Sequence, residues 1–195
     1  MGKSSMQYLQ FIKEMEQLKN VTRTAWTSDG HRESTAEHSW RLAMLAGVML
    51  AEFPELDAQR VLMLALVHDM GELYEGDKSA ADFPDAEEKY KEESEGVQRA
   101  AALLEEPVRS SLIQLWEEYE AGETREARLV KALDKAETII QHNQGANPVD
   151  FDYQFNLDYG KELFSGCEML EDLRRRIDEE TRENVQITNS LQKTV

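Results

Sequence analysis

Cysteine and long apolar runs are both scarce in this chain. The single cysteine, Cys167, excludes an internal disulfide and a zinc site built on cysteines, which fits a reducing compartment. No segment approaches the roughly 20 apolar residues that a helix needs to cross a bilayer, and the opening MGKSSMQYLQ contains no apolar signal-peptide core. We therefore expect a soluble cytoplasmic protein that has no membrane partner.

Positive charge is also in short supply, with 22 Lys and Arg against 39 Asp and Glu and a formal net charge of -17. A surface that follows a nucleic-acid backbone needs clustered cations, so this composition argues against a long nucleic acid as a partner. A small phosphorylated ligand stays compatible, because a metal ion and one or two arginines can reverse the potential inside a pocket.

Only 4 prolines and 10 glycines interrupt long stretches of Ala, Leu, Glu, Lys and Arg, which favour helix. The sequence predicts an all-α fold in one domain over residues 1–186, followed by a disordered tail over 187–195. The expected helices cover about 5–18, 34–53, 57–71, 85–104, 107–122, 124–142 and 161–183. Residues 20–33 and 143–156 lack helical periodicity, and we expect both to be loops.

Two histidines and two aspartates fall on these helices in a pattern that fits a mononuclear metal site. His38 lies in the first turn of one helix and Asp134 in a much later one, while His68 and Asp69 end a core helix. Neighbours on a helix diverge by about 100°, so the adjacent pair can share an ion only where the helix unwinds, and Gly71 supplies that unwinding. A mixed nitrogen and oxygen set suits one divalent Mn, Co, Fe, Ni or Zn ion better than Mg or Ca.

Each of these four residues could also have an ordinary structural role. A histidine near the end of an apolar helix, such as His68, is often a buried core residue, and Asp69 could be a helix cap. His38 could face solvent, and Asp134 could pair with a nearby lysine. The spacing alone does not decide between the metal site and these structural roles.

The same residues and their neighbours resemble the HD superfamily of metal-dependent phosphohydrolases, whose signature is a lone His, a His-Asp pair and a distant Asp on five core helices. The matching segments are EHSWR around His38, LALVHDMGE around His68-Asp69 and VKALDKAE around Asp134. Over about residues 18–143 the chain looks like the 5'-deoxynucleotidase branch. The resemblance implies an HD-type domain with a five-helix core and an extra C-terminal helix. It also implies hydrolysis of (deoxy)nucleoside 5'-monophosphates to nucleoside and phosphate.

The branch further implies roles for residues beside the metal ligands. Glu72 would orient or deprotonate the attacking water, and Asp77 would position or protonate the leaving sugar oxygen. Arg23 would hold a phosphate oxygen and Trp26 would contact the sugar. In some members the arginine and tryptophan are adjacent, whereas two residues separate them here. Two lysines, Lys78 and Lys89, are further candidates for phosphate contacts.

The sequence also allows these residues purely structural roles, and it allows related activities. Trp26 could anchor a loop, Arg23 could be a surface cation, and Glu72 and Asp77 could belong to a solvated acidic loop. Other HD branches, with the same metal ligands, hydrolyse guanosine tetraphosphate, cyclic dinucleotides or nucleoside triphosphates, and a non-catalytic nucleotide-binding helical module is a further alternative. The resemblance also suggests a homodimer, in which the segment LFSGCEMLEDL either forms the dimer face or closes the monomer's own core.

Overall fold

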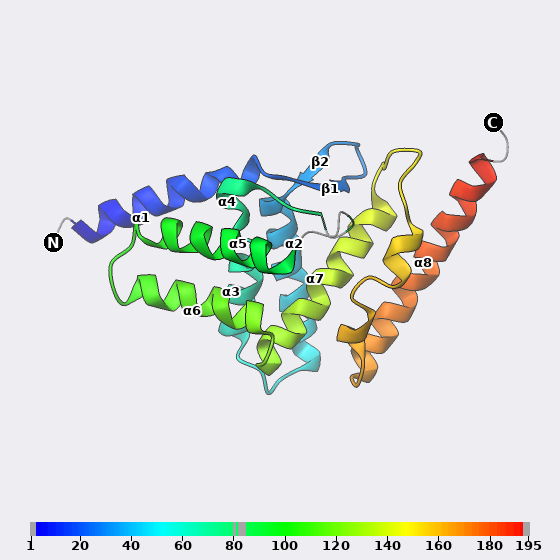
Figure 1. Cartoon of the computed structure of the whole chain (residues 1–195). Coiled ribbons are helices and arrows are strands. Elements are labelled where there is room, and N and C mark those ends of the chain that lie inside the picture. The colour runs from blue at the N-terminus through cyan, green and yellow to red at the C-terminus, as the bar shows by residue number, and fades with distance from the viewer. Residues whose placement is uncertain (1–2, 80, 82–84, 193–195) are drawn as a thin grey trace.

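The computed structural model describes residues 3–79, 81 and 85–192, which form a bundle of helices with one small hairpin (Figure 1). The helices are α1 (Lys3–Glu14), α2 (Thr35–Met49), α3 (Ala58–Val67), α4 (Glu72–Glu75), α5 (Ala86–Ala101), α6 (Val108–Ala121), α7 (Arg125–Gln144) and α8 (Glu168–Gln192). Short 3-10 turns cover Met15–Lys19, Leu50–Glu52, Gln154–Leu157 and Lys161–Phe164. Within the described residues, no helix combines the length and apolar character that crossing a bilayer requires.

Helix ends follow the capping signals in the sequence. Ser34 begins α2 with a capping box, in which its hydroxyl accepts from the Glu37 amide and the Glu37 carboxylate accepts from the Ser34 amide. Asp57 caps α3 in a similar way through its carboxylate. Helix α3 ends at Val67, and residues 68–71 form a turn before α4, as the glycine at its end predicted.

The core lies where α2, α3, α6 and α7 meet, and α5 packs against α6 and the short α4. Leu42, Leu64 and Leu133 are fully buried there, one each from α2, α3 and α7. In Figure 1, α1 lies along α5 at one end of the molecule and α8 flanks α7 at the other. The all-α prediction and the five-helix core with an additional C-terminal helix are confirmed.

Residues 20–33 were expected to form a loop, and this expectation is wrong. Strand β1 (Thr22–Trp26) pairs antiparallel with β2 (Arg32–Ser34), and Gly30 adopts a φ of 93° in the connection. The strands are short and carry no alternating apolar pattern. They are held by α7 instead, because Gln141 Nε2 donates to the Trp26 carbonyl oxygen at 2.7 Å, a contact that a local pattern cannot report.

The C-terminal helix also differs from the prediction. The expected helix over 161–183 is interrupted at Gly166, whose φ of 84° is not helical, and α8 then continues to Gln192. Helix therefore extends into the segment 187–195 that was expected to be disordered. Residues 193–195, like residues 80 and 82–84 of the predicted loop after α4, lie outside the described residues. The division into a domain and a tail stays a prediction.

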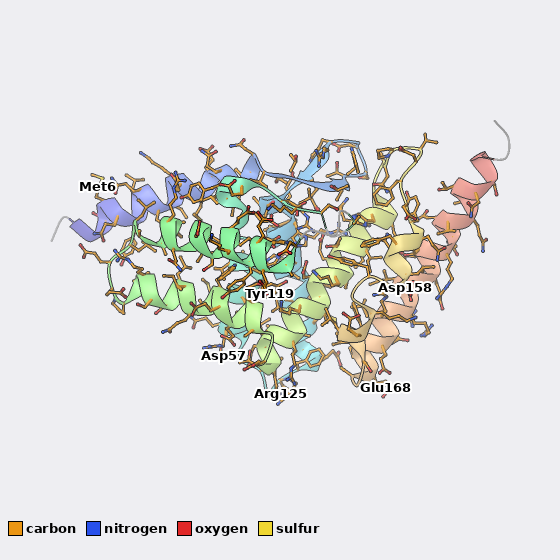
Figure 2. The ribbon with its side chains drawn as sticks, viewed as in Figure 1. Met6, Asp57, Tyr119, Arg125, Asp158 and Glu168 are labelled. Atoms are coloured by element: carbon orange, nitrogen blue, oxygen red, sulfur yellow. The ribbon has the colours of Figure 1, made fainter. Side chains whose placement is uncertain are left out.

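Apolar faces are covered less completely than their periodicity suggests. The first predicted helix carries apolar residues at helical spacing. Among them Leu18 is buried, but Met6, Leu9 and Ile12 are exposed, and Figure 2 shows Met6 at the outer end of α1. Leu66 is also exposed, although it lies within the continuous apolar run VLMLALV of α3. Periodicity predicts which residues share a face, whereas coverage depends on which other elements pack there.

Helix α5 approaches the turn at 68–71 closely because two glycines face each other. A Cβ atom on Gly96 would lie 2.5 Å from the carbonyl oxygen of Gly71, and one on Gly71 would lie 2.5 Å from the Cβ of Glu93. Both distances are far inside the roughly 3.5–4.0 Å of normal carbon contacts. The pair therefore lets α5 pack directly against the turn that carries His68 and Asp69.

We expect Gly96→Ala to destabilise the fold by about 1–3 kcal/mol, the usual cost of overpacking. Gly47→Ala in α2 is the matched control, because its Cβ would meet only Leu62 at 3.5 Å and alanine favours helix over glycine by about 1 kcal/mol. Urea unfolding of both variants measures the difference. Equal stability of the two variants would contradict the close contact at Gly71.

Candidate metal centre and active-site cavity

Four polar side chains from separate parts of the chain meet inside the bundle. His38 comes from α2, His68 and Asp69 from the turn after α3, and Asp134 from α7. His38 Nε2 lies 3.2 Å from His68 Nε2 and 3.1 Å from Asp134 Oδ1. His68 Nε2 lies 3.1 Å from Asp69 Oδ2. The structure therefore brings the four predicted candidates together, with Asp69 partly exposed and the other three buried.

The outer nitrogen of each imidazole already has a hydrogen-bond partner. His68 Nδ1 lies 3.0 Å from the carbonyl oxygen of Ala65, which can only accept, so Nδ1 is the donor. His38 Nδ1 is paired with the carboxylate of Glu137. A backbone carbonyl or a carboxylate in this position is what orients metal-binding histidines in proteins. The inner Nε2 atoms are thereby directed toward each other and toward the two aspartates.

This centre attracts positive charge. Burial and the charge of Arg23 lower the pKa of His38, but the carboxylates of Glu137 and Asp134 outweigh them and raise it to about 10. Burial raises the pKa of Asp134, yet Lys135 and the two histidines hold it well below its usual value. The negative charge of these carboxylates can therefore be compensated either by a proton on His38 Nε2 or by a divalent cation. Two imidazole nitrogens and two carboxylates fit a divalent metal ion.

Three residues that the sequence motifs did not assign to the centre complete its surroundings. Tyr119 of α6, labelled at the middle of the molecule in Figure 2, and Lys135 each donate to Asp134 Oδ2 at 2.8 Å. Asp134 does pair with a lysine, but its other oxygen, Oδ1, faces the histidines. Asp134 is not the only inward-facing acid of the described α7, because Glu137 is only 1% exposed. Its position three residues after Asp134, on the same face, was the available signal.

Glu72 and Asp77 lie beside this centre. Glu72 is buried at the start of α4, and its Oε2 accepts from Thr35 Oγ1 at 3.0 Å, so it does not belong to a solvated loop. Burial and the carboxylates of Asp69 and Asp77 raise the pKa of Glu72 well above its usual value. Gly76 ends α4 with a φ of 84°, which few side chains allow, and Asp77 follows it into the cavity wall.

Arg23 and Trp26 both line the cavity although a regular strand would place them on opposite faces. The register of β1 is irregular between Thr22 and Trp26, and residues 23–26 all line the cavity. Arg23 donates to Asp69 Oδ2 at 3.1 Å and to Thr138 Oγ1 at 3.0 Å, so it is not a surface cation. The two intervening residues, Thr24 and Ala25, therefore do not remove either side chain from the cavity.

The centre opens into a cavity of about 440 Å³, within the range of about 300–1,000 Å³ that small-molecule sites occupy. Its walls come from β1, α7, the segment after α4 and the segment between α7 and α8. Lys78 and Lys89 also line it. Both are near acids, since Lys78 is paired with Glu92 and Lys89 Nζ lies 3.3 Å from Glu93 Oε1.

Comparison with known proteins places this arrangement in a family. The model described as HD domain matches residues 15–170. The chain belongs to the HD domain family. Among HD-domain relatives, the Homo sapiens protein named 5'-deoxynucleotidase HDDC2 is 39% identical over 145 residues, which cover 73% of this chain and 70% of the relative. The Schizosaccharomyces pombe protein named 5'-deoxynucleotidase hdd1 is 34% identical over 143 residues, covering 70% of this chain and 71% of the relative.

A solved structure agrees with the sequence relatives. The structure described as a predicted metal-dependent phosphohydrolase from Magnetospirillum magnetotacticum MS-1 superposes with a TM-score of 0.79 at 28% identity, covering 93% of this chain and 97% of that one. The resemblance to the HD superfamily and to its 5'-deoxynucleotidase branch is therefore confirmed.

A divalent ion that binds only the folded chain should raise its melting temperature. At 100 times the Kd this stabilisation is about 2.7 kcal/mol, which corresponds to about 5–10 °C for a chain of this size. We expect Mn, Co or Zn added to chelator-treated protein to give this shift in calorimetry. His38→Ala should lose the shift, whereas His31→Ala, whose ring is 53% exposed outside the cluster, should keep it. An undiminished shift in His38→Ala would contradict the location of the site.

Proposed function

We propose that this HD-domain chain is a metal-dependent 5'-deoxynucleotidase, which hydrolyses (deoxy)nucleoside 5'-monophosphates to nucleoside and phosphate. The observation that carries the proposal is the convergence of His38, His68, Asp69 and Asp134 at a cavity that also contains Arg23. Relatives of that name at 39% and 34% identity support it. We assign the four residues as ligands of one divalent transition ion, drawn from Mn, Co, Fe, Ni and Zn.

Glu72 is proposed as the group that takes a proton from the attacking water. When bound, the divalent ion supplies Lewis-acid activation of water and neutralises charge on the phosphoryl group. The hydroxyl of Thr35 donates to Glu72 Oε2 and so orients this carboxylate. A carboxylate whose pKa is raised by burial and by neighbouring acids is suited to proton transfer near neutral pH.

The remaining cavity residues are proposed to bind the rest of the nucleotide. Arg23 offers a fork of N–H donors beside Asp69, where a phosphate oxygen can be held, and Lys89 adds positive charge nearby. Asp77 positions or protonates the departing 5' oxygen. Trp26 contacts the sugar, where the absence of a 2'-hydroxyl can be sensed by contact with the ring.

Replacement of a ligand should remove metal and activity together. Asp69→Ala deletes a ligand oxygen that also accepts from Arg23, so we expect the purified variant to retain no ion and release no phosphate. Metal analysis beside a phosphate-release assay on dAMP, dGMP, dCMP, dTMP and dUMP measures both. Turnover by metal-free Asp69→Ala would exclude this mechanism.

Replacement of the general base, Glu72, should separate metal binding from turnover. Glu72→Gln keeps the shape and the Thr35 contact but cannot take a proton, so we expect metal to stay bound while kcat falls about 100- to 10,000-fold. Glu75→Gln, on the exposed side of the same short helix, is the matched control and should keep wild-type kcat. A wild-type rate in Glu72→Gln would remove Glu72 from the chemistry.

The expected homodimer, the cytoplasmic location and the absence of a long nucleic-acid partner stay predictions. In the segment LFSGCEMLEDL, Phe164 and Leu170 pack into the chain's own core, and Met169 is exposed. These two buried residues support the alternative in which the segment closes the monomer's own core.

A further inference from the structure

The cavity extends well beyond the four-residue centre, along one face of α7. Asp134, Thr138 and His142 follow one another at four-residue intervals, so they span about 12 Å of this helix, and all three line the cavity. Arg23 contacts Thr138, one turn from Asp134, and the carbonyl of Trp26 is bonded to α7 about two turns from Asp134. The cavity therefore has one end at the proposed ion site and another near His142.

The second end has aromatic walls. The ring of Phe151 lies edge-on to that of His142, with centroids 4.9 Å apart, and edge-on to that of Trp26 at 6.2 Å. Phe151 and Trp26 are only partly buried, so part of each ring remains accessible. Phe155, from the same segment as Phe151, continues the wall. We refer to Trp26, His142, Phe151 and Phe155 as the aromatic compartment.

The side-chain amide of Asn156 lies at this compartment and has an incomplete set of hydrogen bonds. Its side chain is 0% exposed and lines the cavity, and its Oδ1 lies 2.9 Å from His142 Nδ1. Its Nδ2 is buried and has no hydrogen-bond partner among the described residues. Whichever way round the amide is placed, one of its two polar atoms lacks a partner. Buried polar atoms in proteins nearly always have a hydrogen-bond partner. The missing partner here therefore indicates that a ligand supplies it.

Charge distinguishes the two ends of the cavity. The cations Arg23 and Lys135 contact the aspartates of the proposed ion site. Near the aromatic compartment the charged lining residues are the acids Asp150 and Asp152, which neighbour Phe151 in the chain. With the proposed divalent ion bound, the positive charge at the first end favours a phosphate there, whereas the acids at the second end repel one. The second end suits an uncharged, flat group with polar edges.

We propose that the aromatic compartment binds the nucleobase of the substrate, with the ring against Phe151 and one polar edge on the amide of Asn156. This inference rests on the proposed function and adds the part of the site that holds the base. Every base has an aromatic face, so stacking on Phe151 contributes affinity for all of them. The amide meets donors and acceptors that differ between bases, so Asn156 sets the order of preference.

The test compares each deoxynucleotide with the 5-phosphate of methyl 2-deoxyribofuranoside, which keeps the sugar and the phosphate ester but has no base. Wild-type protein should show a higher kcat/KM for the nucleotides. Phe151→Ala should reduce this preference roughly 5- to 150-fold, the range measured for base stacking on aromatic side chains. Phe151→Tyr keeps the ring and should keep the preference. Val149→Ala, 79% exposed in the same segment, is the matched control.

Asn156→Asp tests the amide with a nearly one-atom change, because it retains an oxygen for His142 and replaces the nitrogen. We expect it to change the order of kcat/KM among dAMP, dGMP, dCMP and dTMP. An unchanged order would overturn the role of Asn156. Competition in wild-type protein avoids any folding defect: deoxynucleosides should inhibit hydrolysis of the base-free ester competitively, and a lack of inhibition would overturn the compartment.

The inference is also overturned if Phe151→Ala slows the nucleotides and the base-free ester by the same factor, or if wild-type protein does not prefer the nucleotides. Failure of the proposed function has a different signature, because wild-type protein would then release phosphate from neither class of compound.

Discussion

Two carboxylates, the buried Asp134 and the partly exposed Asp69, face two buried imidazole nitrogens, and this cluster is the constraint on which the structure depends. Such a cluster is costly inside a protein unless positive charge compensates it. Lys135 donates to the outer oxygen of Asp134, whereas Arg23 donates to Asp69 Oδ2, the same oxygen that faces His68. Asp69 Oδ2 and Asp134 Oδ1 each lie within 4.0 Å of the Nε2 atoms of both histidines, and this mixed nitrogen and oxygen set fits a divalent ion.

The fold around this cluster serves mainly to hold its members in place. Glu137 and a backbone carbonyl orient the two histidines, and the Gly71–Gly96 contact presses α5 against the turn that carries the His-Asp pair. Helix α7 connects the cluster to the rest of the cavity, because Asp134 and His142 lie on the same face two turns apart. A nucleotide could therefore lie along this helix with its phosphate at one end and its base at the other.

The helices and the four candidate ligands could be predicted from the sequence because their signals are local or chemically distinctive. Caps such as Ser34 and Asp57 act within four residues, and a His-Asp pair just before a glycine places two possible metal ligands where an apolar helix can end. The hairpin could not be predicted, since it depends on a contact with α7. The position of Asn156 in the cavity could not be predicted either, because a buried amide without a full set of hydrogen bonds results from packing and leaves no local sequence pattern.

Anomalous diffraction at the absorption edge of a bound metal tests the four-ligand centre most directly. In crystals grown with one divalent transition metal, we expect a single strong peak about 2.0–2.2 Å from the Nε2 atoms of His38 and His68 and from carboxylate oxygens of Asp69 and Asp134. Glu33 and Glu137, on the other side of His38, form a competing group whose ligand atoms also lie close together. A peak on that group, or none among the four residues, would contradict the assignment of the metal centre.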